Sequence, residues 1–128
     1  MKNNNLISFI AAFSFISFFS FNVGAAGLCP SKEKAGWHES GQKNFNMYCA
    51  SCHGEKGDGN GPAAVALNPK PRNFAKDAFK NGDSVDQIYV TLTEGLKEKG
   101  PTMVGFPNLK GDDGCAVAYY VKSFRKKK

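Results

Sequence analysis

The sequence predicts an all-α fold in which three or more helices are joined by long loops. Three stretches carry apolar residues at spacings of three and four, the period of one helix face. Glycine and proline are concentrated between these stretches, at residues 54–73 and 97–109, and both residue types favour turns and loops. No run of residues has the pattern of a strand in a large sheet.

The first helix is predicted to run from near Ser40 into Cys52. Residues 27–36, which precede it, have no helical pattern and are predicted to form an extended or loosely ordered arm. The positions that recur on one helix face are Phe45, Tyr48, Cys49 and Cys52.

The second helix is predicted to begin at Ser84. Ser84 and Gln87 match a capping box, in which each side chain bonds the backbone N–H of the other residue. Gly95 is a suitable end for this helix. The apolar face between them consists of Val85, Ile88, Tyr89 and Leu92.

The last helix is predicted to begin near Asp112 or Asp113, because carboxylates stabilise a helix N-terminus. Its basic C-terminal end complements the opposite pole of the helix dipole. The side chains that share its apolar face are Val117, Tyr120, Val121 and Phe124.

Residues 1–25 are predicted to be a signal peptide. Lys2 gives a weakly positive start, residues 6–21 are almost entirely apolar, and Val23–Ala25 offers small residues for cleavage. The apolar run is shorter than the ~20 residues needed to span a bilayer, which favours cleavage over a retained membrane anchor. Lipid attachment at Cys29 is an alternative, but Leu28 stands where a small residue belongs.

The remaining chain is divided into an N-terminal arm, residues 26–38, and one domain, residues 39–128. Export indicates a bacterial periplasm or an equivalent oxidising compartment. The formal charge is +6, but an exported chain without a nucleic-acid-binding motif is not expected to bind nucleic acid. The basic tail, Arg125–Lys128, is either a solvated end or a device that steers acidic partner proteins.

Cys49, Cys52 and His53 form a C-x-x-C-H motif, the attachment site of a c-type haem. Each thiol can add to one vinyl group of the porphyrin, and His53 then provides an axial ligand to the iron. A zinc site would need four ligands, and a thioredoxin-like site would need a strand–helix context. We therefore expect one covalently bound haem c, which also supplies apolar surface that so small a domain lacks.

Met103 is predicted to be the second axial ligand of the iron. Met1 leaves with the signal peptide, Met47 lies on the helix that carries the motif, and His38 lies upstream of that helix. Met103 follows a loop long enough to approach from the opposite face of the ring. The alternative is a methionine that only fills apolar space.

Beyond this motif, residues 39–124 resemble a class I monohaem cytochrome c. Gly41 and Phe45 stand where the family's N-terminal helix carries them, and Ala118-Tyr119 matches its terminal helix. Residues 54–74 resemble small periplasmic cytochromes c of bacterial respiratory chains. The resemblance implies a cytochrome c fold in which the two helices cross, with Gly41 allowing close approach and Phe45 packed against Tyr119.

The resemblance also assigns two residues around the haem. The carbonyl of Pro62 is expected to accept a hydrogen bond from His53 Nδ1–H, and Arg72 is expected to pair with a haem propionate. An ordinary turn proline and a solvated arginine are the alternatives. The chain departs from many relatives because Val104-Gly105, rather than a proline, follows Met103.

Cys29 and Cys115 are also outside the family pattern. Because the resemblance implies that the first and last helices pack together, a disulfide between the two cysteines is geometrically plausible. Two separate thiols are the alternative.

The function expected from these features is electron transfer by a monohaem cytochrome rather than enzymatic catalysis. Its partners would be redox proteins with acidic docking surfaces, not a small-molecule substrate, and Lys43, Lys56 and Lys99 are candidates for the docking edge. Membrane association requires an uncleaved signal or a lipid on Cys29. Alternatives are a haem c subunit fixed to a larger oxidoreductase and a five-coordinate haem enzyme of the peroxidase type.

Overall fold

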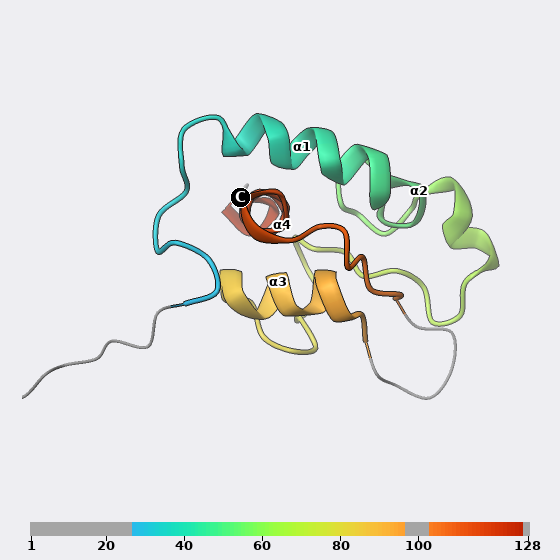
Figure 1. Cartoon of the computed structure of the whole chain (residues 1–128). Coiled ribbons are helices and arrows are strands. Elements are labelled where there is room, and N and C mark those ends of the chain that lie inside the picture. Colours follow the sequence, from blue (N-terminus) through green and yellow to red (C-terminus); the bar gives the residue numbers. More distant parts are fainter. Residues whose placement is uncertain (1–26, 97–102, 127–128) are drawn as a thin grey trace, which may run out of the picture.

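The computed structural model describes residues 27–96 and 103–126, so the predicted signal peptide lies outside the described residues. Those two ranges contain helices and loops but no strand, which confirms the all-α prediction (Figure 1). Their one β-type pairing is an isolated bridge between Gly95 and Val104. The elements in chain order are α1 (Trp37–Tyr48), α2 (Ala50–His53), η1 (Pro62–Ala66), α3 (Val85–Glu94), α4 (Gly111–Ser123) and η2 (Phe124–Lys126). Within the same two ranges, no helix is long and apolar enough to cross a membrane.

Helices α1 and α4 cross at Gly41, as expected. A Cβ atom on Gly41 would lie 2.3 Å from the carbonyl oxygen of Ala116, so only glycine permits this approach. The expected contact between Phe45 and Tyr119 is wrong. The fully buried ring of Phe45 instead lies 5.4 Å from the ring of Tyr120, centroid to centroid. Adjacent helical residues point about 100° apart, so Tyr120 faces Phe45 in the middle of α1, whereas Tyr119 is turned toward Trp37 at the start of that helix.

Tyr119 belongs to a second contact region, where the N-terminal arm meets α4. Its ring lies 5.9 Å from that of Trp37, and its hydroxyl donates a hydrogen bond to the Pro30 carbonyl at 2.6 Å. A disulfide joins Cys29 to Cys115, which decides between the two alternatives for these cysteines. The sulfur of Cys29 is therefore not available for a lipid.

Helix α3 follows its sequence signals closely. Ser84 is the N-cap, and both hydrogen bonds of the capping box with Gln87 are present. Gly95 ends the helix with a φ of 78°, a left-handed value that glycine accommodates without strain. Its buried residues, Ile88 and Leu92, belong to the core shared with α4, and α3 lies next to that helix (Figure 1).

The first helix differs from its prediction in detail. It begins at Trp37, inside the segment expected to be arm, and α1 ends at Tyr48. Cys49 turns the chain with φ −118° and ψ −32°, and α2 then carries the motif to His53. The hydrogen bond from the His53 N–H to the Cys49 carbonyl, 2.9 Å long, keeps the helical path across this distortion. The short helix η1 was not expected within the glycine- and proline-rich loop.

Candidate functional site

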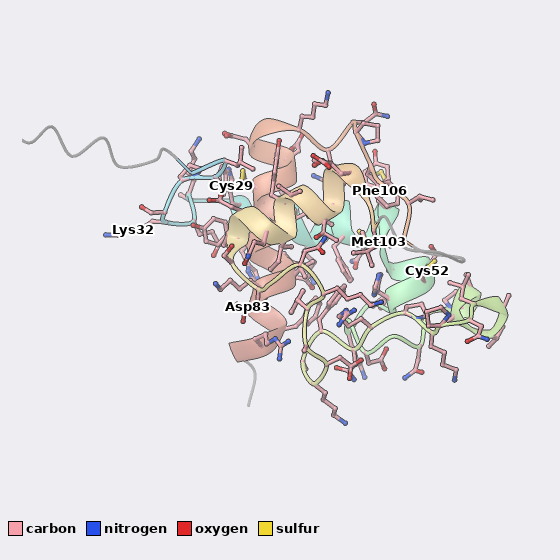
Figure 2. The ribbon with its side chains drawn as sticks, turned by 90° about the horizontal axis from the view of Figure 1, so that it is seen from below. Cys29, Lys32, Cys52, Asp83, Met103 and Phe106 are labelled. Atoms are coloured by element: carbon pink, nitrogen blue, oxygen red, sulfur yellow. A yellow bond between two sulfur atoms is a disulfide. The ribbon has the colours of Figure 1, made fainter. Side chains whose placement is uncertain are left out.

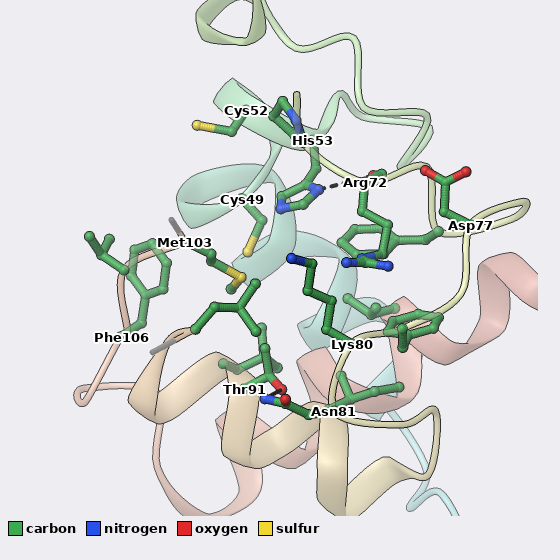
Figure 3. Close-up of a pocket in the computed structure, with 18 of the residues that line it drawn as sticks. Cys49, Cys52, His53, Arg72, Asp77, Lys80, Asn81, Thr91, Met103 and Phe106 are labelled. Atoms are coloured by element: carbon green, nitrogen blue, oxygen red, sulfur yellow. Dashed lines mark hydrogen bonds between the residues drawn. The ribbon is translucent and has the colours of Figure 1, made fainter. Parts of the chain in front are cut away.

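The main cavity of the fold has a volume of about 560 Å³. Its walls come from the end of α1, from α2, from residues 67–82, from one face of α3 and from residues 103–106 (Figure 3). Most of the lining is apolar, and the volume falls within the range of about 300–1,000 Å³ that is usual for cofactor sites. The cavity is therefore large enough for an extended apolar group.

The three residues of the C-x-x-C-H motif all line this cavity (Figure 3). Cys49 is buried, and burial, reinforced by the nearby Cys52, raises the pKa of the Cys49 thiol to about 12. Cys52 is partly exposed at the edge of the cavity. Both cysteines are free thiols, whereas Cys29 and Cys115 are joined to each other. The motif therefore presents two free cysteines and one imidazole to the same space.

His53 is held by the loop that follows η1. Its Nδ1 lies 3.3 Å from the carbonyl oxygen of Arg72, and its ring stacks on Phe74 with centroids 4.4 Å apart. A carbonyl can only accept, so in this hydrogen bond Nδ1 carries the proton and Nε2 keeps its lone pair. Burial lowers the pKa of His53, and its hydrogen bond to the Arg72 carbonyl opposes that effect. The neutral imidazole that results is the form that binds a metal.

The expected partner of Nδ1, the carbonyl of Pro62, does not make this hydrogen bond. Pro62 is exposed at the start of η1, while Gly61 before it bonds its N–H to the Cys52 carbonyl at 3.2 Å. The loop thus contacts α2 through Gly61, and Pro62, the next residue, points away from His53 into solvent. The returning segment, residues 71–74, lies beside His53 and supplies the acceptor from Arg72.

Met103 enters the same cavity from a separate segment of the chain (Figure 3). Its carbonyl accepts a hydrogen bond from the Leu96 N–H at 3.0 Å, and the Phe106 N–H donates to the Leu92 carbonyl at 2.8 Å. These bonds on either side of Val104 attach the segment to the end of α3. The position of Met103 is therefore fixed by backbone contacts, although no proline follows it.

One side of the cavity is polar. Arg72 lines it, as expected of a residue that pairs with an anionic group, and Lys80 points toward the same space (Figure 3). Asn81 donates a hydrogen bond from its Nδ2 to Thr91 Oγ1 at 3.1 Å. Sequence reasoning missed Lys80, Asn81 and Thr91. Thr91 could have been found because it shares the cavity-facing side of α3 with Ile88 and Leu92.

The family model described as "Cytochrome c" matches residues 38–125, which is more than half of the chain. The chain belongs to the cytochrome c family. Members of this family bind covalently attached haem c, and their chemistry is haem-based electron transfer. The expected bounds of the domain, residues 39–128, stay a prediction.

A solved structure similar to this cytochrome is a chain of the reducing HAO-like protein complex of Kuenenia stuttgartiensis. The two chains are 30% identical, with a TM-score of 0.61. The match covers 74% of this cytochrome but only 44% of the other chain, so this cytochrome spans less than half of that neighbour's length. A search of the curated proteins gave no significant match.

The residues of the cavity fit a haem c. Two thiols and a neutral imidazole come from α2 and the turn before it, a thioether enters from another segment, and the rest of the lining is mostly apolar. Arg72 and Lys80 on the polar side suit the carboxylates of a porphyrin. The sulfur, imidazole and basic side chains that line the cavity thus all have a role in binding one haem c.

Proposed function

We propose that this cytochrome is a carrier of single electrons that holds one haem c in the cavity between α1, α2, α3 and residues 103–106. Cys49 and Cys52 would form the two thioether bonds, and His53 Nε2 and the sulfur of Met103 would be the axial ligands. The observation that carries the proposal is the meeting of these four side chains, from two separate segments, in one mostly apolar cavity. The sequence contains one C-x-x-C-H motif, which supports a single haem.

Bound in this way, the haem supplies a one-electron Fe(III)/Fe(II) couple. As a ligand, the soft and neutral thioether of Met103 would favour the reduced state. The hydrogen bond from His53 Nδ1 to the Arg72 carbonyl keeps Nε2 directed at the cavity. Arg72 would hold a propionate. If His53 and Met103 both bound the iron, no coordination site would remain open for a substrate, which favours a carrier over a peroxidase-type enzyme.

We place the carrier in the periplasm, where it would pass electrons between soluble or membrane redox partners of a respiratory chain. The apolar segment at residues 6–21 and the disulfide between Cys29 and Cys115 both support an exported protein in an oxidising compartment. The formal charge of +6 supports partners with acidic surfaces, which would accelerate encounter at low salt.

A second candidate is a haem c subunit fixed to a larger oxidoreductase. The observation in its favour is the similar chain from the HAO-like complex, of which this cytochrome spans 44%. The two candidates share the same haem chemistry and differ in mobility. The mass of the protein isolated from its native source separates a free carrier from a subunit anchored by an uncleaved signal, because loss of residues 1–25 with haem attached indicates a free carrier.

Substitution of Met103 tests the ligand set. In Met103→Ala, we expect the far-red absorption band of oxidised methionine-ligated haem to disappear and the iron to become high-spin by electron paramagnetic resonance. Met47→Leu is the matched control, because the Met47 side chain is 60% exposed on α1. An unchanged spectrum in Met103→Ala, or a high-spin resting spectrum in the unaltered protein, would overturn the proposal, and the latter would favour the enzyme.

A further inference from the structure

Arg125 is the first residue of the basic tail, for which the sequence left two interpretations, a solvated end and a device that steers partners. Lys127 and Lys128 lie outside the described residues, as does Lys99. Arg125 is described, and it belongs to η2, the short helix that continues α4. Its Nε is shielded from solvent. The start of the tail is therefore part of the packed domain.

The guanidinium of Arg125 contacts the segment formed by residues 76–83. Its Nη2 donates a hydrogen bond to the backbone carbonyl of Asp77, and its central carbon lies 4.9 Å from the centroid of the Phe79 ring. The end of α4 accordingly lies beside the segment that leads to Asp83 (Figure 2). A planar guanidinium suits both contacts, because it can stack on an aromatic face while its N–H groups donate in its own plane.

The ring of Phe79 continues this contact toward the cavity. It stacks on Phe74 with centroids 5.6 Å apart and an interplanar angle of 14°. Phe74 in turn stacks on the imidazole of His53, at 4.4 Å and 22°. A series of ring contacts thus runs from the guanidinium of Arg125 to the imidazole. In close packing of this kind, one ring can tilt only if its neighbour also moves.

The same part of the chain supplies the hydrogen-bond acceptor of His53. The carbonyl of Arg72 lies 3.3 Å from Nδ1 (Figure 3). Two hydrogen bonds join the next residue to the site of the Arg125 contact. The Asn73 N–H donates to the carboxylate of Asp77 at 2.9 Å, and the Asp77 N–H donates to the Asn73 carbonyl at 2.9 Å. A displacement of Asp77 would therefore move the backbone beside the acceptor.

The first half of this segment also has support of its own. The Phe74 N–H donates to the Gly57 carbonyl at 2.8 Å, and the ring of Phe124 stacks on that of Phe74 with centroids 6.1 Å apart. Arg125 attaches the second half, residues 77–79, to the end of α4. Loss of the Arg125 side chain is therefore expected to loosen the segment locally and not to unfold the domain.

We infer that Arg125 is a positioning residue for His53. By holding residues 77–79, it keeps the Arg72 carbonyl against Nδ1 and fixes the orientation of the imidazole. This inference rests on the proposed function, in which Nε2 of His53 binds the haem iron. A hydrogen bond at Nδ1 raises the basicity of the ligand, and a more basic imidazole stabilises Fe(III). Arg125 does not line the main cavity, so this effect on the reduction potential is exerted through His53.

The sign of the change in potential separates this role from a simple effect of charge. Loss of a positive charge near the iron favours Fe(III) and lowers the reduction potential. A weaker hydrogen bond at Nδ1 favours Fe(II) and raises it. Lys122→Gln, in the last turn of α4, removes one positive charge as Arg125→Gln does, and is the matched control. We therefore expect the reduction potential of Arg125→Gln to lie above that of Lys122→Gln.

The hydrogen bond itself is measured by exchange of the His53 Nδ1–H. The reduced, haem-loaded proteins are transferred to deuterated water, and loss of this proton is followed by NMR together with loss of the amide proton of Leu92, a buried residue of α3. We expect Nδ1–H to exchange about tenfold faster in Arg125→Gln, through local opening of the segment, and the Leu92 amide to exchange as before. In Lys122→Gln both protons should exchange as in the unaltered protein.

Arg125→Lys is the conservative variant. A lysine keeps the charge and can reach the Phe79 ring, but it lacks the planar fork of a guanidinium. We therefore expect its Nδ1–H to exchange at a rate between those of the unaltered protein and Arg125→Gln. If Arg125→Gln yields no haem-loaded protein, Arg125→Lys takes its place in the comparison with Lys122→Gln.

Three results would overturn the inference. The first is equal exchange of Nδ1–H in the Arg125 variant and in Lys122→Gln. The second is a reduction potential of Arg125→Gln at or below that of Lys122→Gln. The third is an equal acceleration of the Leu92 amide, because Arg125 would then support the stability of the whole domain and not the position of His53.

Failure of the underlying function has a different signature. In the unaltered reduced protein, the ring protons of His53 should be shifted far upfield by the porphyrin, as in an imidazole bound to the iron, and the haem should be low-spin. If either expectation fails, the electron-carrier proposal itself is wrong. If both hold and Arg125→Gln behaves as Lys122→Gln does, only the role of Arg125 is wrong.

Discussion

A Cβ atom on Gly95 would lie 2.6 Å from the carbonyl oxygen of Met103. Gly95, which ends α3, is thus also in close contact with the backbone of residues 103–105. Gly95 has a positive φ of 78°, so a side chain there would be strained by the backbone as well as by the contact.

Replacement of this glycine should disturb Met103, the proposed second ligand. In Gly95→Ala, we expect Met103 to move and the far-red band of methionine-ligated haem to weaken or vanish, with a loss of stability of about 1–3 kcal/mol. Gly36→Ala is the control, because Gly36 has a φ of 79° but no atom within 4 Å of its Cβ position. Equal spectra for both variants would show that the Gly95 contact does not position Met103.

The crossing of α1 and α4 should tolerate no side chain at residue 41. Gly41→Ala forces a methyl group into the backbone of Ala116, so we expect the free energy of unfolding to fall by about 2–3 kcal/mol or more. Gln42→Ala, at an exposed position of the same helix, should change it by less than about 0.5 kcal/mol. Denaturant unfolding of the haem-loaded proteins measures both values, and similar values for both would contradict the close packing.

The disulfide should stabilise the domain by fastening the arm to α4. Replacing both Cys29 and Cys115 with alanine removes a link across 86 residues, and we expect a loss of about 2–4 kcal/mol in denaturant unfolding. The haem spectrum should be unchanged, because neither residue lines the cavity. Denatured, haem-loaded protein should show no reactive thiol, and two reactive thiols would disprove the bond.

The domain should depend on its cofactor for folding. In a Cys49→Ala/Cys52→Ala variant isolated without haem, the cavity of about 560 Å³ would lie unfilled at the core. A domain of this size has little other apolar area to stabilise it, so we expect it to be largely unfolded by far-UV circular dichroism. The variant that lacks only Cys29 and Cys115 should keep its haem and its helical spectrum. Native-like helicity in the haem-free protein would contradict this expectation.

The elements that local sequence determines were predicted well. Ser84, Gln87 and Gly95 fix both ends of α3 through bonds within a few residues of each other, and the structure has those bonds. The attachment motif is equally local, so its spacing alone was enough to assign Cys49 and His53 to one site. The family match supports the haem, while the roles of individual ligands stay predictions.

Features that depend on contacts between distant segments were predicted less well. Tyr119 and Tyr120 are adjacent and identical, and only the rotation of α4 against α1 decides which one meets Phe45. The acceptor for His53 lies 19 residues further along the chain, and the path of that loop brings the Arg72 carbonyl to the ring and leaves Pro62 outside.

The disulfide has a consequence for how this molecule is made. One pair of sulfurs must be oxidised to each other, whereas the other pair must still carry hydrogen when the porphyrin vinyl groups arrive. Cys49 and Cys52 are near neighbours in sequence and could close on each other, while Cys29 has to find a partner 86 residues away. Correct maturation therefore requires a cell that can oxidise and reduce different thiols of one nascent chain, in the right order.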